Sequence, residues 1–98
     1  MALTMIDDYE VMYSANTFPP RVWLKAGGKY IGQLIFHPDQ SALPPDTQNG
    51  QTNLHYHLED LQNILDLLRN EKPMYLLFSG SGPGFENGIK TTPEPVGT

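Results

Sequence analysis

The segment Arg21–Pro38, RVWLKAGGKYIGQLIFHP, contains the clearest structural signal in the chain. Two runs of alternating apolar residues flank Gly27 and Gly28, and glycines readily adopt the positive φ angles that a two-residue hairpin turn requires. We therefore expect strands over 21–26 and 29–37 that pair antiparallel. Neither face of the second strand is plainly polar, which indicates a central strand or a strand with one side covered by a partner.

The second informative segment changes the apolar period from two residues to between three and four. This period predicts an amphipathic helix over 58–71, with acidic residues near its start and basic residues near its end that suit the helix dipole. Its apolar stripe consists of Leu58, Leu61, Ile64, Leu65 and Leu68. Pro73 ends the helix, and the apolar run over 74–79 predicts a buried strand.

Weaker patterns predict the remaining elements. Alternation over 9–15 favours a strand near the N-terminus, although the acidic residues before it would also suit the start of a helix. Alternation over 52–58 favours another strand, and residues 38–51 predict a long surface loop, since they are rich in Pro, Asp, Asn and Gly. The C-terminal region predicts a short edge strand around 88–92 and an extended or frayed tail over 91–98.

Together these elements predict an α+β fold with an antiparallel sheet of four or five strands and the 58–71 helix packed on one face. With 98 residues, the chain fits a single domain over 1–98. A formal net charge of −5 opposes binding to nucleic acid. The apolar runs are too short to cross a membrane. The lack of cysteine fits a cytoplasmic location and leaves histidine and carboxylates as metal ligands.

Three histidines form a candidate zinc site. His55 and His57 project from the same face of one predicted strand, and His37 ends the strand that precedes the long loop. If these two strands paired antiparallel, the three imidazoles would converge as zinc ligands, with a fourth position open for water. The alternative is that the histidines occupy the polar face of a strand that leads into the helix.

Aromatic residues form a candidate interface or ligand patch. One helix covers one face of a sheet, and aromatic side chains on the other face would form an apolar patch typical of an interface. The predicted patch consists of Trp23, Tyr30, Tyr56 and Tyr75. It predicts a homodimer formed through the sheet. We identify no catalytic or cofactor-binding residue, because the glycine-rich run over 80–84 lacks the spacing of a phosphate-binding loop.

Two segments carry a resemblance: HYHLEDLQNILDLLRNEKPMYLLF over 55–78 and TTPEPVG over 91–97. They resemble short bacterial hypothetical proteins with an LLRNEKP helix end and a T-x-x-EPVG tail, a group associated with mobile elements such as integron cassettes. The resemblance covers most of the chain and implies a bacterial accessory protein with no assigned activity. It also raises the alternative that the tail docks through Glu94 on the body or on a neighbouring subunit rather than fraying.

The sequence thus leads to two main functional hypotheses. The first is a non-enzymatic binding or adaptor module that self-associates through its sheet and binds an unknown protein or small molecule. The second is a small metal-binding protein or metal-dependent enzyme built on His37, His55 and His57, with zinc as the metal. A third hypothesis is a small-molecule pocket between the helix, the sheet and the glycine-rich loop.

Overall fold

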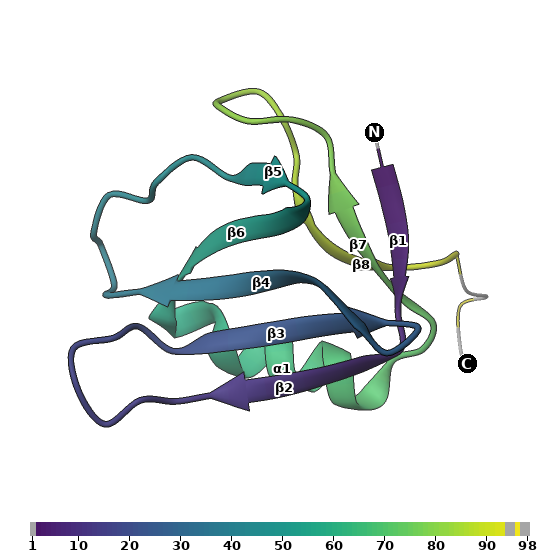
Figure 1. The fold of residues 1–98 in the computed structure, drawn as a ribbon, viewed down its shortest axis with the longest axis horizontal. Coiled ribbons are helices and arrows are strands. Elements are labelled where there is room, and N and C mark those ends of the chain that lie inside the picture. The colour runs from purple at the N-terminus through teal and green to yellow at the C-terminus, as the bar shows by residue number, and fades with distance from the viewer. Residues whose placement is uncertain (1, 94–95, 97–98) are drawn as a thin grey trace.

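The computed structural model describes residues 2–93 and 96, which form an α+β fold with one helix and two sheets. The strands are β1 (Ala2–Ile6), β2 (Asp8–Met12), β3 (Arg21–Ala26), β4 (Lys29–His37), β5 (Thr47–Asn49), β6 (Gln51–His57), β7 (Met74–Phe78) and β8 (Gly88–Thr91). A 3-10 turn, Leu58–Asp60, leads into the helix α1 (Leu61–Asn70). One sheet has the strand order β2-β3-β4-β6-β5 and the other has the order β1-β7-β8 (Figure 1).

The predicted hairpin of β3 and β4 is confirmed. The two strands pair antiparallel around Gly27 and Gly28, whose φ angles are 60° and 79°. Both values lie in the left-handed region that the favoured two-residue hairpin turn requires. Val22, Leu24 and Leu34 are completely buried on one face of this hairpin. That face is therefore the core side of the five-stranded sheet.

The helix α1 packs on the core side of the five-stranded sheet and lies behind it in Figure 1. Ile64 is buried there, and three half-buried leucines of the predicted stripe pack against the same cluster: Leu61, Leu65 and Leu68. The predicted helix is therefore present, although its first three residues form a 3-10 turn. Within residues 2–93 and 96, no helix is long and apolar enough to cross a membrane.

The prediction of a purely antiparallel sheet is wrong, because β4 and β6 run parallel. The short strand β5 causes this arrangement. A turn at Gly50, with φ of 82°, folds β5 back along one edge of β6, so that β6 lies between β5 and β4. The strand β5 lies within the segment 38–51, for which the sequence predicts a loop, and it leaves residues 38–46 as the connection from β4.

The prediction of one sheet is also wrong, because the N-terminal region forms two strands that join different sheets. Asp7 lies at the corner between β1 and β2. Its carboxylate accepts a hydrogen bond from the Gly27 N–H at 2.7 Å, and its own N–H donates to the Lys25 carbonyl at 3.0 Å. These two bonds fix the point at which the chain passes from the three-stranded sheet to the five-stranded sheet.

The strand β8 lies where the sequence predicts a C-terminal edge strand, and it pairs antiparallel with β7. The predicted tail extends beyond it. Residues 94, 95, 97 and 98 lie outside the described part of the chain, so the proposed docking of Glu94 lies outside it as well.

Gly32 provides a test of how closely the strands approach one another. A Cβ atom at this position would lie 2.5 Å from the Thr52 carbonyl oxygen and 3.3 Å from Leu76 Cδ2. An alanine would therefore force backbone and core side chains to shift. We expect Gly32→Ala to lower the free energy of unfolding by about 3 kcal/mol, measured by urea denaturation with Trp23 fluorescence.

Gly88→Ala is the matched control. A Cβ atom at Gly88 would approach only the Tyr56 hydroxyl, at 3.2 Å. We expect this variant to lose less than about 1 kcal/mol. Equal losses in the two variants would contradict the close approach at Gly32.

Candidate functional site

The three predicted histidine ligands lie at one end of the five-stranded sheet. His37 is the last residue of β4 and His57 is the last residue of β6, and the parallel pairing places the two side by side in register. His37 Nε2 lies 2.8 Å from His55 Nδ1, so these two imidazoles share a hydrogen bond. His57 Nε2 instead lies 2.8 Å from the Ser41 carbonyl oxygen. The structure thus brings two of the three imidazoles together.

The histidine geometry differs from that of a zinc site. Two nitrogens of a tetrahedral zinc site lie about 3.3 Å apart, because each lies about 2.0–2.1 Å from the metal. The contact between His37 and His55 is shorter, at 2.8 Å, and joins nitrogen to nitrogen. In the described part of the chain, no group of three or more His, Cys, Asp or Glu side chains is placed to hold a metal ion. Zinc binding here would require the His37–His55 hydrogen bond to open.

The surroundings of His55 favour its neutral form. Burial lowers the pKa of His55, the nearby His37 lowers it further, and Asp46 raises it. In a hydrogen bond between two neutral imidazoles, one ring donates its N–H and the other accepts with its lone pair. The pair can therefore present either a donor or an acceptor to a ligand.

Asp46 joins His55 to the glycine-rich loop. Its Oδ1 accepts a hydrogen bond from the His55 N–H at 2.9 Å, and its Oδ2 accepts one from Asn87 Nδ2 at 3.0 Å. Ser81 Oγ donates to the Asp46 carbonyl at 2.6 Å, and the Ser79 N–H donates to Asn87 Oδ1 at 2.7 Å. These contacts, termed the Asp46–Asn87 clasp, hold residues 38–46 and the segment between β7 and β8 together.

The sequence pattern gives little indication of the Asp46–Asn87 clasp. Asp46 follows two prolines in a polar loop, and Asn87 precedes a glycine in another. Such residues usually form local turns. Their role here depends on two loops that meet only in the folded chain, and no local spacing encodes that meeting.

The clasp lies beside a shallow pocket of about 460 Å³. The pocket is lined by Leu43, Pro44, Pro45, Asp46, His55, Gly82 and Pro83. Apolar walls with a few convergent polar groups are typical of small-molecule sites. The third hypothesis expects a pocket beside the glycine-rich loop, and this pocket has that location, although α1 does not line it.

The predicted aromatic patch is divided among three surfaces. Trp23 and Tyr30 lie on the outer face of the five-stranded sheet in an edge-on contact, with ring centroids 6.4 Å apart. Tyr56 lies on the core side, stacked on Phe36 at 5.6 Å, and burial raises its pKa to about 12. Tyr75 belongs to the three-stranded sheet. The structure therefore brings only Trp23 and Tyr30 together.

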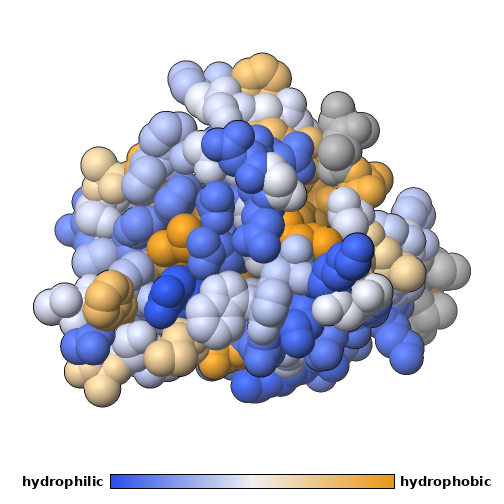
Figure 2. All heavy atoms as spheres, viewed as in Figure 1, coloured by the Kyte–Doolittle hydropathy of each residue, from blue (hydrophilic) through white to orange (hydrophobic). Residues whose placement is uncertain are grey.

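The outer face of the five-stranded sheet is mostly hydrophilic, with separate hydrophobic spots (Figure 2). A row of side-chain hydrogen bonds crosses four of its strands. Trp23 Nε1 donates to Gln33 Oε1 at 3.2 Å, and Gln33 Nε2 donates to Asn53 Oδ1 at 2.9 Å. Asn53 Nδ2 donates to Thr47 Oγ1 at 3.3 Å. Many polar groups of this face thus have partners within the sheet.

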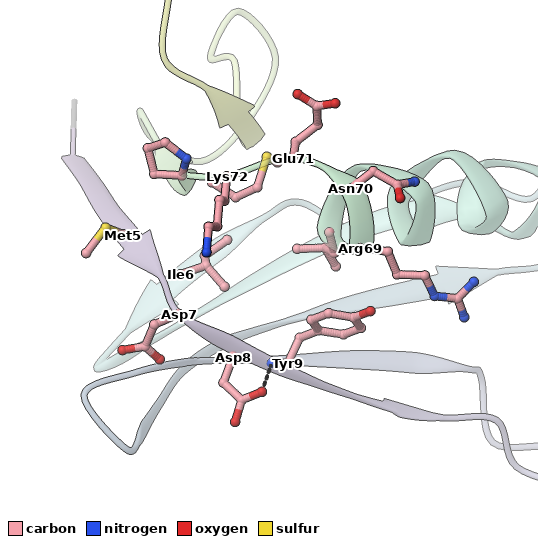
Figure 3. A pocket seen from close by; sticks show the side chains of 12 residues that line it. Met5, Ile6, Asp7, Asp8, Tyr9, Arg69, Asn70, Glu71 and Lys72 are labelled. Atoms are coloured by element: carbon pink, nitrogen blue, oxygen red, sulfur yellow. Dashed lines mark hydrogen bonds between the residues drawn. The ribbon is translucent and has the colours of Figure 1, made fainter.

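A larger pocket, of about 780 Å³, lies at the other end of α1, beside the corner between β1 and β2 (Figure 3). Lys72 reaches from the segment after α1 toward Ile6, whereas Arg69 and Glu71 point away (Figure 3). Three acidic and two basic residues line this pocket, so it carries charges of both signs. The smaller pocket joins a histidine pair to a carboxylate, and we take it as the candidate functional site.

No protein-family model, curated protein or solved structure matches this chain. The resemblance to short bacterial hypothetical proteins stays a prediction, and so do the bacterial origin and the cytoplasmic location.

Removal of the Asp46 carboxylate breaks the two hydrogen bonds of the clasp that this side chain accepts. In Asp46→Ala, the His55 N–H loses its acceptor, and the Asn87 amide loses one of two acceptors and keeps the Gly80 carbonyl. We expect the free energy of unfolding to fall by about 2 kcal/mol, because the partly buried His55 N–H is left unpaired and Asn87 loses a charged acceptor. Asp66→Ala is the control, since Asp66 is an exposed carboxylate that accepts from Gln62. A comparable loss in both variants, measured by urea denaturation, would contradict the role of the clasp.

The lowered pKa of His55 makes the free energy of unfolding depend on pH. Its pKa in the folded chain lies below 6.5, so the unfolded chain binds a proton more readily between the two values. The stabilising contribution is complete above pH 6.5 and is lost as the pH falls through the folded pKa. In an NMR titration of the imidazole, His37→Ala should raise the pKa of His55, because a neighbour that lowers it is removed. An unchanged or lower pKa would contradict the pairing.

Proposed function

We propose that the protein is a non-enzymatic binding module that self-associates through its sheet. The observation that supports this most strongly is an apolar, exposed region on the three-stranded sheet. Leu3 and Met5 of β1 are 49% and 52% exposed, and they pair in register with Leu77 and Tyr75 of β7. Hydrophobic atoms gather at the right of Figure 2, where Figure 1 places β1 and β7. Apolar patches of this kind mark interfaces.

The contrast between the two sheets supports self-association through the smaller one. On the five-stranded sheet, the outer face carries a row of paired polar side chains, and a partner would have to replace those bonds. On the three-stranded sheet, a partner would instead cover apolar side chains that now face water. A chain of 98 residues has a small core, so this additional burial is a large gain for it.

The binding part of the proposal concerns the pocket at His55. Its walls are two prolines and a leucine from one loop and a glycine and a proline from another, all supported by the Asp46–Asn87 clasp. A preformed pocket avoids the cost of ordering loops when a ligand binds. The ligand that fits is a small apolar molecule with one hydrogen-bonding group, directed at His55.

A metal-binding protein is the second candidate, because His37 and His55 lie side by side. Their shared hydrogen bond would have to open before both nitrogens, now 2.8 Å apart, could face one ion. His57 would complete the site only by giving up its contact with Ser41. Calorimetric titration with Zn²⁺ separates the two candidates. Stoichiometric binding that His55→Ala abolishes supports the metal site. If the wild-type chain does not bind Zn²⁺, the result supports the binding module that works without metal.

Sedimentation equilibrium of the wild-type chain tests the self-association. We expect a reversible monomer–dimer equilibrium, because a small apolar contact gives modest affinity. Hydrogen exchange at high and low protein concentration should show added protection in β1 and β7 and no change in Trp23 or Gln33. A monomer at every concentration up to the millimolar range would contradict self-association.

A further inference from the structure

Within residues 2–93 and 96, one edge of β1 pairs with no other strand. In the part of the chain that the structure describes, β7 is the only strand that pairs with β1, and β1 lies at the outside of the fold (Figure 1). Its central residues Leu3, Thr4 and Met5 are all exposed. A free edge presents backbone N–H and C=O groups that another strand can pair with.

This edge lacks the features that usually prevent such pairing. Protected edges carry charged residues or proline, contain a bulge, or are very short. The strand β1 has the sequence ALTMI, with five residues, no charge and a regular register against β7. It is therefore open to another strand.

The other sheet edges differ from β1. The strand β2 carries Asp8 and Glu10, and the Asp8 carboxylate accepts the Tyr9 N–H at 2.9 Å. The strand β5 has only three residues, all polar, and β8 has four residues including Lys90. Among the edges of the two described sheets, β1 combines an uncharged sequence with exposed apolar side chains.

We propose that the self-association described above joins two copies of this chain edge to edge, through the free edge of β1 in each copy. This inference rests on the proposed function and specifies the strand, its direction and its register. The two β1 strands pair antiparallel about a two-fold axis at Thr4. The two three-stranded sheets then form one continuous sheet of six strands.

Charge determines the direction of pairing. Asp7 follows β1 directly, and the chain has a formal net charge of −5. Parallel pairing would place the two Asp7 side chains next to each other. Antiparallel pairing about Thr4 separates them by roughly 20 Å, at about 3.4 Å per residue. This distance is about two and a half times the Debye length in physiological salt, which is about 8 Å, so antiparallel pairing avoids the repulsion.

The apolar side chains determine the register. Only a two-fold axis at Thr4 pairs every residue of β1 with a residue of the partner strand. Leu3 then lies opposite the partner's Met5, and Met5 lies opposite the partner's Leu3. Figure 3 shows Met5 on the side of β1 away from Ile6, so Leu3 and Met5 project from the outer face. Four apolar side chains cover the seam between the two copies.

Substitution at Thr4 tests the axis. Thr4 is exposed, so a charged residue there leaves the fold intact. Thr4→Lys alone, or Thr4→Asp alone, places like charges opposite each other and should weaken dimerisation by about tenfold. An equimolar mixture of the two variants should form a heterodimer with restored affinity. Asn49→Lys on the exposed edge of β5 is the matched control and should dimerise as the wild type does.

A cysteine at the same position gives an independent measurement. The chain contains no cysteine, so Thr4→Cys introduces a single thiol. Directly opposite residues of antiparallel strands have Cα atoms about 4.5–5.5 Å apart, which a disulfide can span. Mild oxidation should therefore convert Thr4→Cys to a covalent dimer at protein concentrations where Asn49→Cys stays monomeric.

The outcomes separate this inference from the proposed function. If the wild type dimerises, Thr4→Lys dimerises equally well and Thr4→Cys does not cross-link, then pairing through β1 is wrong and self-association through another surface remains. If sedimentation shows only monomer at every concentration, the proposed self-association and the pairing through β1 are both wrong. Three results together establish the strand and its register. Thr4→Lys and Thr4→Asp each weaken dimerisation, their mixture restores it, and Thr4→Cys forms the cross-linked dimer.

Discussion

The corner at Asp7 determines which strand edges of the two sheets are exposed to solvent. Its carboxylate holds the turn at Gly27, and its N–H holds the end of β3 at Lys25. Because the chain turns there, β1 pairs with β7 and β2 pairs with β3. One continuous strand would have placed these residues along one edge. The corner instead creates two different edges: an apolar edge at β1 and an acidic edge at β2.

At the other end of α1, the position of β5 arranges the candidate site. The strand β5 pairs with β6 only as far as Asn53, so the backbone N–H of His55 lies beyond the end of that ladder. The Asp46 side chain accepts this N–H in place of a strand carbonyl. The same carboxylate also binds Asn87, and it thereby draws the glycine-rich loop over His55. A polar side chain at the end of a short strand thus brings two loops together at a histidine pair.

The sequence predicted the elements that depend on neighbouring residues. The hairpin at Gly27 and Gly28 and the helix that contains Ile64 follow from local spacing and local turn chemistry. The parallel pairing of β4 with β6 does not, because it depends on where β5 lies in the sheet. For the same reason, the contact of His37 with His55 was expected from antiparallel strands and arises from parallel ones. Patterns within one strand do not specify which strand lies beside it.

Surface roles were the least predictable from sequence. Aromatic residues on different strands suggested one patch, yet Tyr56 faces the core and Tyr75 lies on the other sheet. The exposure of Leu3 and Met5 follows from the corner at Asp7, which no periodicity in the N-terminal residues revealed. Apolar residues at the start of a chain look like core residues until the strand that they form is placed at an edge.

Isotope-filtered NMR on a mixture of labelled and unlabelled wild-type protein tests whether the free edge of β1 joins two copies of the chain, because it detects only contacts between copies. If it does, intermolecular contacts should appear between the methyl groups of Leu3 and Met5. Intermolecular contacts confined to Trp23 and Tyr30, on the outer face of the five-stranded sheet, would contradict pairing through β1.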